Sequence, residues 1–149
     1  MQLCAGHKSG CEAAVHTMRE IYNDSSTDGV LLVDASNAFN SLNRQTALRN
    51  VKGRCPSLAT FLINTYRTNT NLFIDGETIL SKEGTTQGDP LGMTMYAIAT
   101  ALLIHKLSVN SIKQLWYADD AGVGGKLDGL RNWWDQLSMQ RGSGFWILR

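Results

Sequence analysis

The chain has 149 residues, of which 43% are hydrophobic and 18% are charged, as in an ordinary globular protein. Its 14 Lys and Arg side chains against 13 Asp and Glu leave a formal net charge of +1, which excludes the strong basic excess of many independent nucleic-acid-binding domains. Three scattered cysteines make no paired disulfide framework, and the N-terminus lacks a signal peptide, so an intracellular location, in the cytoplasm or nucleus, is expected. The most apolar stretch, residues 93–107, contains His105 and Lys106 and predicts a core helix rather than a membrane span.

The periodicity of the apolar residues predicts the secondary structure, with helical spacing in some segments and short apolar or alternating runs in others. In chain order we expect a helix over 11–22, a strand over 30–33, helices over 43–51 and 58–66, strands over 71–74 and 78–80, a helix over 93–107, strands over 114–118 and 121–124, and a final helix after residue 125. This order predicts one domain of the α+β class, with helices packed on one face of an antiparallel sheet.

Three local signals add detail to this prediction. The apolar run 30–33 is partly β-branched, which is typical of a strand buried on both faces. Asp75-Gly76 between two apolar runs is a strong signal for a tight hairpin. The loop 84–92 contains three glycines, so its backbone can approach a ligand closely.

Three aspartates lie at the edges of predicted strands, beside apolar residues. Asp34 ends the first strand, and Asp119 and Asp120 lie between the last two. Like charges held close together raise each other's pKa unless a cation neutralises them, so this arrangement is typical of a divalent-metal site, with Mg²⁺ as the expected ion. Adjacent strand residues point to opposite faces, so Asp119 and Asp120 can both face a metal only if the turn re-aims one of them. The alternative is that Asp34 caps the next segment and the Asp pair makes a solvated turn.

Three segments occur in the order of the motifs of a known enzyme family, namely Val33–Leu42, Gln87–Gly92 and Tyr117–Asp120. Together they resemble the palm of reverse transcriptases, close to the non-LTR retroelement, group II intron and retron-like branch. The similarity extends from about Gln2 to Phe145. It implies a polymerase palm-like fold in which residues 1–29 lead into the palm, 30–124 form its core and 125–149 contain a C-terminal helix.

The resemblance implies RNA-templated DNA synthesis, in which a DNA primer is extended with dNTPs on an RNA template by two-metal catalysis. The implied catalytic residues are Asp34, Asp119 and Asp120, and the family motif together with strand alternation ranks Asp120 below Asp119. With the backbone carbonyl of Ala35 they would bind two Mg²⁺ ions, which Mn²⁺ can replace. The implied partners are the template, the primer and dNTPs, and no membrane.

The same resemblance assigns roles to residues around the metals. Phe39, with Ala38 before it, matches the nucleotide-binding position under the incoming sugar, where a bulky ring would exclude a ribose 2′-hydroxyl. Gln87 and Gly88 match the segment that contacts the nascent base pair and the template backbone. Tyr117 is placed at the nucleic acid. The alternative for Phe39 is a position in the hydrophobic core.

Two further sets of residues were weighed outside this site. Cys4, His7, Cys11 and His16 are potential zinc ligands, but Cys11 and His16 lie five residues apart within a predicted helix and share a face poorly. Small buried cysteines are the simpler expectation for Cys4 and Cys11. Arg44 resembles a recurrent basic residue after the first motif, and the open alternative is a side chain in solvent or near a phosphate, so Arg44 stays outside the catalytic set.

The ends of the chain depart from the resemblance. The thumb and most of the fingers would lie outside residues 1–149, so we expect a fragment that the remaining fingers and thumb segments of the parent polymerase would complete. After Phe145 the family continues with a Gly-Tyr-Phe-like segment, whereas this chain has Trp146–Arg149. A single-base insertion that shifts the reading frame after Phe145 would explain the difference. Two functional alternatives stay open: a non-catalytic remnant that retains the palm fold, and the palm of an RNA-directed RNA polymerase, against which Phe39 argues.

Overall fold

The computed structural model describes residues 2–3 and 6–140. Its helices are α1 (Gly10–Asn23), α2 (Ala38–Ser41), α3 (Arg44–Arg54), α4 (Pro56–Tyr66), α5 (Gly92–Lys106) and α6 (Leu127–Met139). Its strands are β1 (Gly29–Asp34), β2 (Thr70–Ile74), β3 (Glu77–Ser81), β4 (Ile112–Tyr117) and β5 (Asp120–Gly125). The α+β class and each predicted element are confirmed, and the short helix α2 is an addition. Within the described residues, no helix has the length and apolar character needed to cross a bilayer.

Strands β1, β5 and β4 form a three-stranded antiparallel sheet with β5 in the centre. The β4–β5 connection is the two-residue loop Ala118-Asp119, and the register pairs Tyr117 with Asp120. On the other side of β5, the register with β1 places Asp34 opposite Asp120. The first and last sequence motifs therefore meet at one corner of this sheet.

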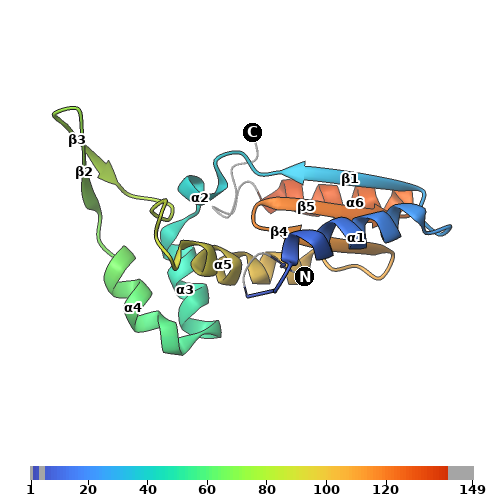
Figure 1. Cartoon of the computed structure of the whole chain (residues 1–149), viewed down its shortest axis with the longest axis horizontal. Coiled ribbons are helices and arrows are strands. Elements are labelled where there is room, and N and C mark those ends of the chain that lie inside the picture. Colours follow the sequence, from blue (N-terminus) through green and yellow to red (C-terminus); the bar gives the residue numbers. More distant parts are fainter. Residues whose placement is uncertain (1, 4–5, 141–149) are drawn as a thin grey trace.

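Helices lie on both faces of the sheet (Figure 1). Helices α5 and α6 share the main hydrophobic core with Ala121 and Val123 of β5, whereas α1 packs on the opposite face, mainly over β4 and β5. Glycine allows this close approach, since a Cβ on Gly124 would lie 2.2 Å from Cγ2 of Ile21 in α1. The expected single helical face is therefore the α5–α6 face, and α1 forms a further layer.

Strand β1 is not buried on both faces, contrary to the expectation from its apolar run. Leu31 and Val33 pack against the main core, but the side chain of Leu32 is 73% exposed. The reason is tertiary, because β1 is an edge strand and α1 lies mainly over the other two strands. The same offset leaves Val15 of α1 exposed.

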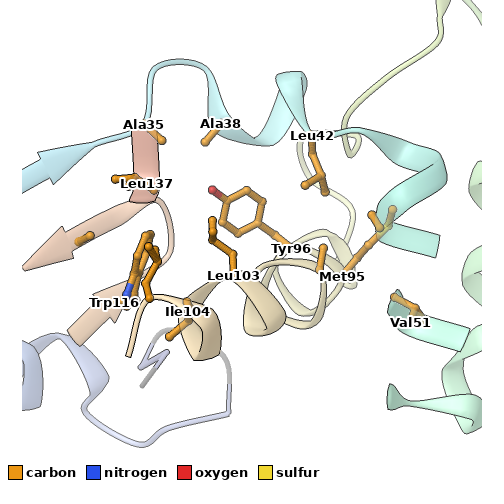
Figure 2. Packing of buried hydrophobic residues seen from close by; sticks show 14 of the residues in the cluster. Ala35, Ala38, Leu42, Val51, Met95, Tyr96, Leu103, Ile104, Trp116 and Leu137 are labelled. Atoms are coloured by element: carbon orange, nitrogen blue, oxygen red, sulfur yellow. The ribbon is translucent and has the colours of Figure 1, made fainter. Parts of the chain in front are cut away.

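The main core surrounds helix α5 (Figure 2). Met95, Tyr96 and Leu103 of this helix are buried, and Figure 2 shows Tyr96 close to the segment that carries Ala35 and Ala38. Burial of side chains of this size stabilises the fold by roughly 1.5–3 kcal/mol each. The chain that leaves β1 is thus held against α5 by its buried alanines.

The β2–β3 hairpin projects from the end of the molecule opposite the three-stranded sheet (Figure 1). Its turn residues Asp75 and Gly76 have φ values of +51° and +79°, as the Asp-Gly signal predicts. All residues of the two strands are exposed except Ser81, which is half-buried. Because two strands alone bury little surface, this hairpin depends on the contacts at its base.

Candidate active site

Asp34, Asp119 and Asp120 lie at one corner of the three-stranded sheet. Asp34 and Asp120 are directly opposite each other on neighbouring strands, so their side chains leave the same face of the sheet. Asp119 lies beside them in the two-residue loop. The register therefore makes Asp120 the partner of Asp34, whereas the family motif and strand alternation ranked Asp119 first. The difference arises because Asp119 lies in the loop and β5 begins only at Asp120.

The corner is electrostatically negative. Loss of hydration raises the pKa of Asp120, and the charges of Asp119 and then Asp34 raise it further. In the part of the chain that the structure describes, the ion pairs join Lys113 to Asp24 and Lys126 to Asp28, at the opposite end of the sheet. A cation from solution would therefore relieve the repulsion between the three carboxylates.

The donor set at this corner fits Mg²⁺ in its chemistry. Carboxylate oxygens are hard ligands, and Mg²⁺ is usually held by one or two of them together with substrate phosphates and water. Among residues 2–3 and 6–140, no three His, Cys, Asp or Glu side chains form a group that could hold a metal by themselves. Ala35, the expected carbonyl ligand, directly follows β1 and has its methyl group buried in the main core. Oxygen atoms of a bound substrate would have to complete the site.

The alternative zinc site receives no support from the described residues. Cys4 lies outside them, and the ring Nδ1 of His7 lies 3.1 Å from the carbonyl oxygen of Lys8. Cys11 is exposed, so the expectation that it is a buried residue was wrong. It lies in the first turns of α1, on the side that the sheet leaves uncovered.

An apolar groove of about 490 Å³ runs from α1 to the acidic corner. Leu32 of β1 and Met18 of α1 line it, and Asp34 and Asp120 lie on its border. Tyr117, expected at the nucleic acid, is half-buried, lines the same groove and packs against the cluster under α1. The tyrosine is thus held by the protein on one side, and its role at a nucleic acid stays a prediction.

The backbone of the acidic turn is unusual. Ala118 has a φ of +54°, in the left-handed region that disfavours a residue with a Cβ, and it is buried. Nε2 of Gln2 donates to the carbonyl oxygen of Ala118 and Oε1 of Gln2 accepts from its N–H, both at 2.9 Å. No local sequence pattern indicates this contact, since the two residues are 116 positions apart.

Phe39 lies in α2, the helical turn that follows β1. Its ring stacks on Tyr96 with a centroid distance of 4.4 Å, and its side chain is half-buried. Ala38 before it is buried in the main core. The core alternative therefore accounts for one side of Phe39, and the expected contact with a sugar stays a prediction for the accessible side.

The loop between β3 and α5 is bonded to α2. The N–H of Gly84 donates to the carbonyl oxygen of Leu42 at 2.8 Å, and the N–H of Thr85 donates to that of Phe39 at 2.9 Å. Gly84 has a φ of +72°, and a Cβ there would lie 2.5 Å from the carbonyl oxygen of Phe39, so only glycine fits. The loop that carries the second motif is thus fastened to the segment that carries the first.

Beyond this anchor the loop turns outward. Gln87 and Gly88 are exposed, and Gly88 has a φ of +88°. Asp89 shapes the turn, because its Oδ1 accepts from the N–H of Leu91 at 2.8 Å and its other oxygen accepts from the hydroxyl of Tyr66. Burial and then this hydrogen bond raise the pKa of Tyr66. Gln87 and Gly88 are therefore presented to solvent on a braced loop.

Arg44 has a different role from the one expected. It is neither in solvent nor free for a phosphate, because only 7% of its surface is exposed. Its Nε donates to the carbonyl oxygen of Gly84 at 3.0 Å, and its Nη2 donates to the carbonyl oxygen of Glu83 at 2.7 Å. Nη1 and Nη2 also donate to the carbonyl oxygen and hydroxyl of Ser81. The guanidinium lies 5.3 Å from the ring centroid of Tyr66, and its burial lowers the pKa of Arg44.

Comparison with known proteins identifies the fold. No protein-family model and no curated protein sequence matches the chain. The solved structures that it resembles include apo telomerase from Candida tropicalis, with a TM-score of 0.69 and 12% identity, and apo telomerase from the same organism truncated from its C-terminal domain, with 0.57 and 14%. Each match covers 97% of this chain, which spans 31% and 34% of the two telomerase chains. The chain therefore shares the fold of part of these telomerase structures and spans about a third of their length.

Proposed function

We propose that the chain is the palm part of a reverse transcriptase of the non-LTR retroelement or group II intron-like branch, and that it serves RNA-templated DNA synthesis. The observation that carries this proposal is the pairing of Asp34 with Asp120 across β1 and β5, with Asp119 in the adjoining loop. The likeness to telomerase structures supports it at the level of the fold. The hydrogen bonds from Gly84 and Thr85 to Leu42 and Phe39 support it further, because they join the loop that carries the second motif to the segment that carries the first.

The chemistry proposed for this corner is nucleotidyl transfer. Two Mg²⁺ ions, when bound, would lower the pKa of the primer 3′-hydroxyl and stabilise the charge that develops as the α-phosphorus is displaced in line. The side chains of Asp34, Asp119 and Asp120 and the carbonyl oxygen of Ala35 would hold them. The chain's own contribution is preorganisation, since the strand register fixes two of the carboxylates before any ligand arrives.

The neighbouring residues would select and align the substrates. Phe39 is braced by its stack on Tyr96, and a braced ring excludes a ribose 2′-hydroxyl better than a mobile one. Gln87 and Gly88 are exposed on the braced loop, where they are free to meet a base pair and the template backbone. Tyr117 would face the nucleic acid with its accessible edge.

Primer extension on an RNA template with dNTPs and Mg²⁺ tests the proposal. We would compare the chain alone with the chain joined to the fingers and thumb of a related polymerase. In the joined protein we would then compare Asp34→Asn with Asp135→Asn. Asp135 is an exposed aspartate of α6 and makes a matched control for the loss of one charge. We expect the joined protein to extend the primer. Asp34→Asn should abolish this extension and Asp135→Asn should leave it unchanged. A folded joined protein that extends no primer would favour the non-catalytic remnant.

The choice of sugar separates a DNA polymerase from an RNA polymerase. In the joined protein, Phe39→Ala should increase incorporation of ribonucleotides relative to deoxynucleotides, because it removes the ring that would collide with the 2′-hydroxyl. Unchanged discrimination would remove Phe39 from this role. Preference of the unmodified protein for ribonucleotides would favour the palm of an RNA-directed RNA polymerase.

A further inference from the structure

We propose that Gln2 is a positioning residue for the acidic turn: its side-chain amide holds Ala118 in the left-handed conformation and thereby sets the directions of Asp119 and Asp120. The contacts that carry the inference are the two hydrogen bonds between Gln2 and Ala118. Its consequence for metal binding rests on the proposed function. Its consequence for the turn itself does not.

The amide of Gln2 matches both backbone polar groups of Ala118. The amide nitrogen of Gln2 donates to the carbonyl oxygen of Ala118, and the amide oxygen of Gln2 accepts from the N–H of Ala118, both at 2.9 Å. A carboxylate lacks the donor and an ammonium lacks the acceptor, so an amide side chain is suited to this pairing. Ala118 is 7% exposed, and buried N–H and C=O groups without partners are costly. Gln2 therefore supplies both backbone partners of a buried loop residue that lies outside the β4–β5 pairing.

The turn needs such support because its own sequence is unsuited to it. Two-residue hairpin loops with positive φ favour Gly, Asn or Asp, whose backbones tolerate this region. Alanine at a φ of +54° has no such advantage. Asp119 follows Ala118 directly and Asp120 follows next, so a change of φ and ψ at Ala118 would turn both carboxylates.

The backbone on either side of the Gln2 side chain is itself fixed. Gln2 forms a parallel bridge with Trp116 of β4, and the N–H of Leu3 donates to the carbonyl oxygen of Trp116 at 2.8 Å. Leu3 is buried in a cluster with Leu115. At the start of α1, a Cβ on Gly10 would lie 2.1 Å from the carbonyl oxygen of Leu3, so the helix packs tightly on this segment. The amide therefore acts on the turn from a fixed base.

The test uses the full chain and two readouts. Hydrogen exchange of the Ala118 amide and its HN–Hα coupling report the conformation of the turn, and titration with Mn²⁺, followed by NMR line broadening, reports metal binding at the corner. We would compare Gln2→Ala, Gln2→Met, the double variant Gln2→Ala with Ala118→Gly, and the control Gln45→Ala. Gln45 is exposed on α3 and lies in none of the sites described above.

Loss of the amide should loosen the turn and weaken the metal site. In Gln2→Ala and Gln2→Met we expect faster exchange of the Ala118 amide, an altered coupling, and a Mn²⁺ dissociation constant about 10- to 100-fold higher, as for other groups that orient metal ligands. The double variant should recover part of the affinity, because glycine adopts positive φ without the penalty of a Cβ. Gln45→Ala should leave both readouts unchanged.

Several outcomes would overturn the proposal. Unchanged exchange and coupling of Ala118 in both Gln2 variants would show that the amide does not hold the turn. An altered turn with unchanged Mn²⁺ affinity would reduce Gln2 to a structural partner of Ala118. If the unmodified chain shows no Mn²⁺ broadening at Asp34 and Asp120, the proposed function fails, and the exchange and coupling of Ala118 still decide whether Gln2 sets the turn.

Discussion

Two hairpins of this molecule have loops of the same length and opposite designs. The β2–β3 turn is Asp75-Gly76, a sequence that adopts positive φ readily, and its strands are exposed. The β4–β5 turn has Ala118 at positive φ, in a buried position that the side chain of Gln2 supports. The first turn is stable by its local sequence, whereas the second is imposed by tertiary contacts. Local strain that the surroundings maintain is typical of functional sites, and here it lies beside the three aspartates.

The two hairpins also differ in what holds their strands. Strand β5 is central in its sheet and has helices on both faces, so its position is fixed by packing. Strands β2 and β3 pair only with each other, and Arg44 fastens the end of β3 to the rest of the chain. The sheet is thus expected to be the stable part of the fold and the hairpin the part most easily altered.

The largest effect is expected from removing an aromatic ring beneath the sheet. Trp133 of α6 is fully buried, and its Nε1 donates to Oε1 of Gln114 at 3.0 Å. Trp133→Ala should lower the free energy of unfolding by about 3–5 kcal/mol. Phe73→Ala, in a hairpin residue that is 78% exposed, should change it by less than about 0.5 kcal/mol. Urea unfolding followed by circular dichroism measures both, and equal losses would contradict the comparison.

The next effect concerns the link between the two regions. Arg44→Met should lower the free energy of unfolding by about 2 kcal/mol, because it leaves the carbonyl oxygens of Ser81, Glu83 and Gly84 without their donor. Amide exchange in β3 should accelerate more than exchange in β5. Arg49→Met, at an exposed position of the same helix, is the matched control. Protection of β3 that survives Arg44→Met would show that the hairpin has another anchor.

A smaller effect, of opposite sign, is expected at the acidic corner. Like charges directly opposite each other in a sheet are unfavourable, so Asp34→Asn should raise the free energy of unfolding by about 0.2–1 kcal/mol in EDTA. With Mg²⁺ added, the unmodified chain should gain stability and Asp34→Asn should not. Thermal unfolding in both buffers, with Asp135→Asn as the control, measures the difference. An Asp34→Asn variant that Mg²⁺ still stabilises as much as the unmodified chain would exclude a metal site at Asp34.

The smallest effect is a pH dependence at the same corner. Because the pKa of Asp120 is raised in the folded chain, the folded state binds a proton at higher pH than the unfolded state does. The contribution of Asp120 to stability should therefore become more favourable as the pH falls through the region just above the ordinary aspartate pKa of about 3.9. The difference in unfolding free energy between the unmodified chain and Asp120→Asn isolates this term. A difference that stays constant with pH would contradict it.

The sequence alone was sufficient for the elements with strong local signals. Apolar periodicity predicted α1, the long apolar stretch predicted α5, and the Asp-Gly pair predicted the β2–β3 hairpin, because these signals act within a few residues. The three aspartates were recognisable as one candidate site, since carboxylates at strand ends beside apolar residues are unusual. The predicted burial of both faces of β1 was wrong, because burial depends on which strands a helix covers.

What the sequence by itself determined is therefore the helices and strands other than α2, the α+β class and the residue types of the candidate site. Only the tertiary structure decided that Asp34 faces Asp120, that Arg44 is buried against backbone carbonyls, and that Gln2 holds Ala118. The physical reason is distance along the chain. Local patterns fix torsion angles, whereas register, side-chain pairing and burial arise between residues that lie 40 to 116 positions apart and meet only when the sheet and its helices pack together.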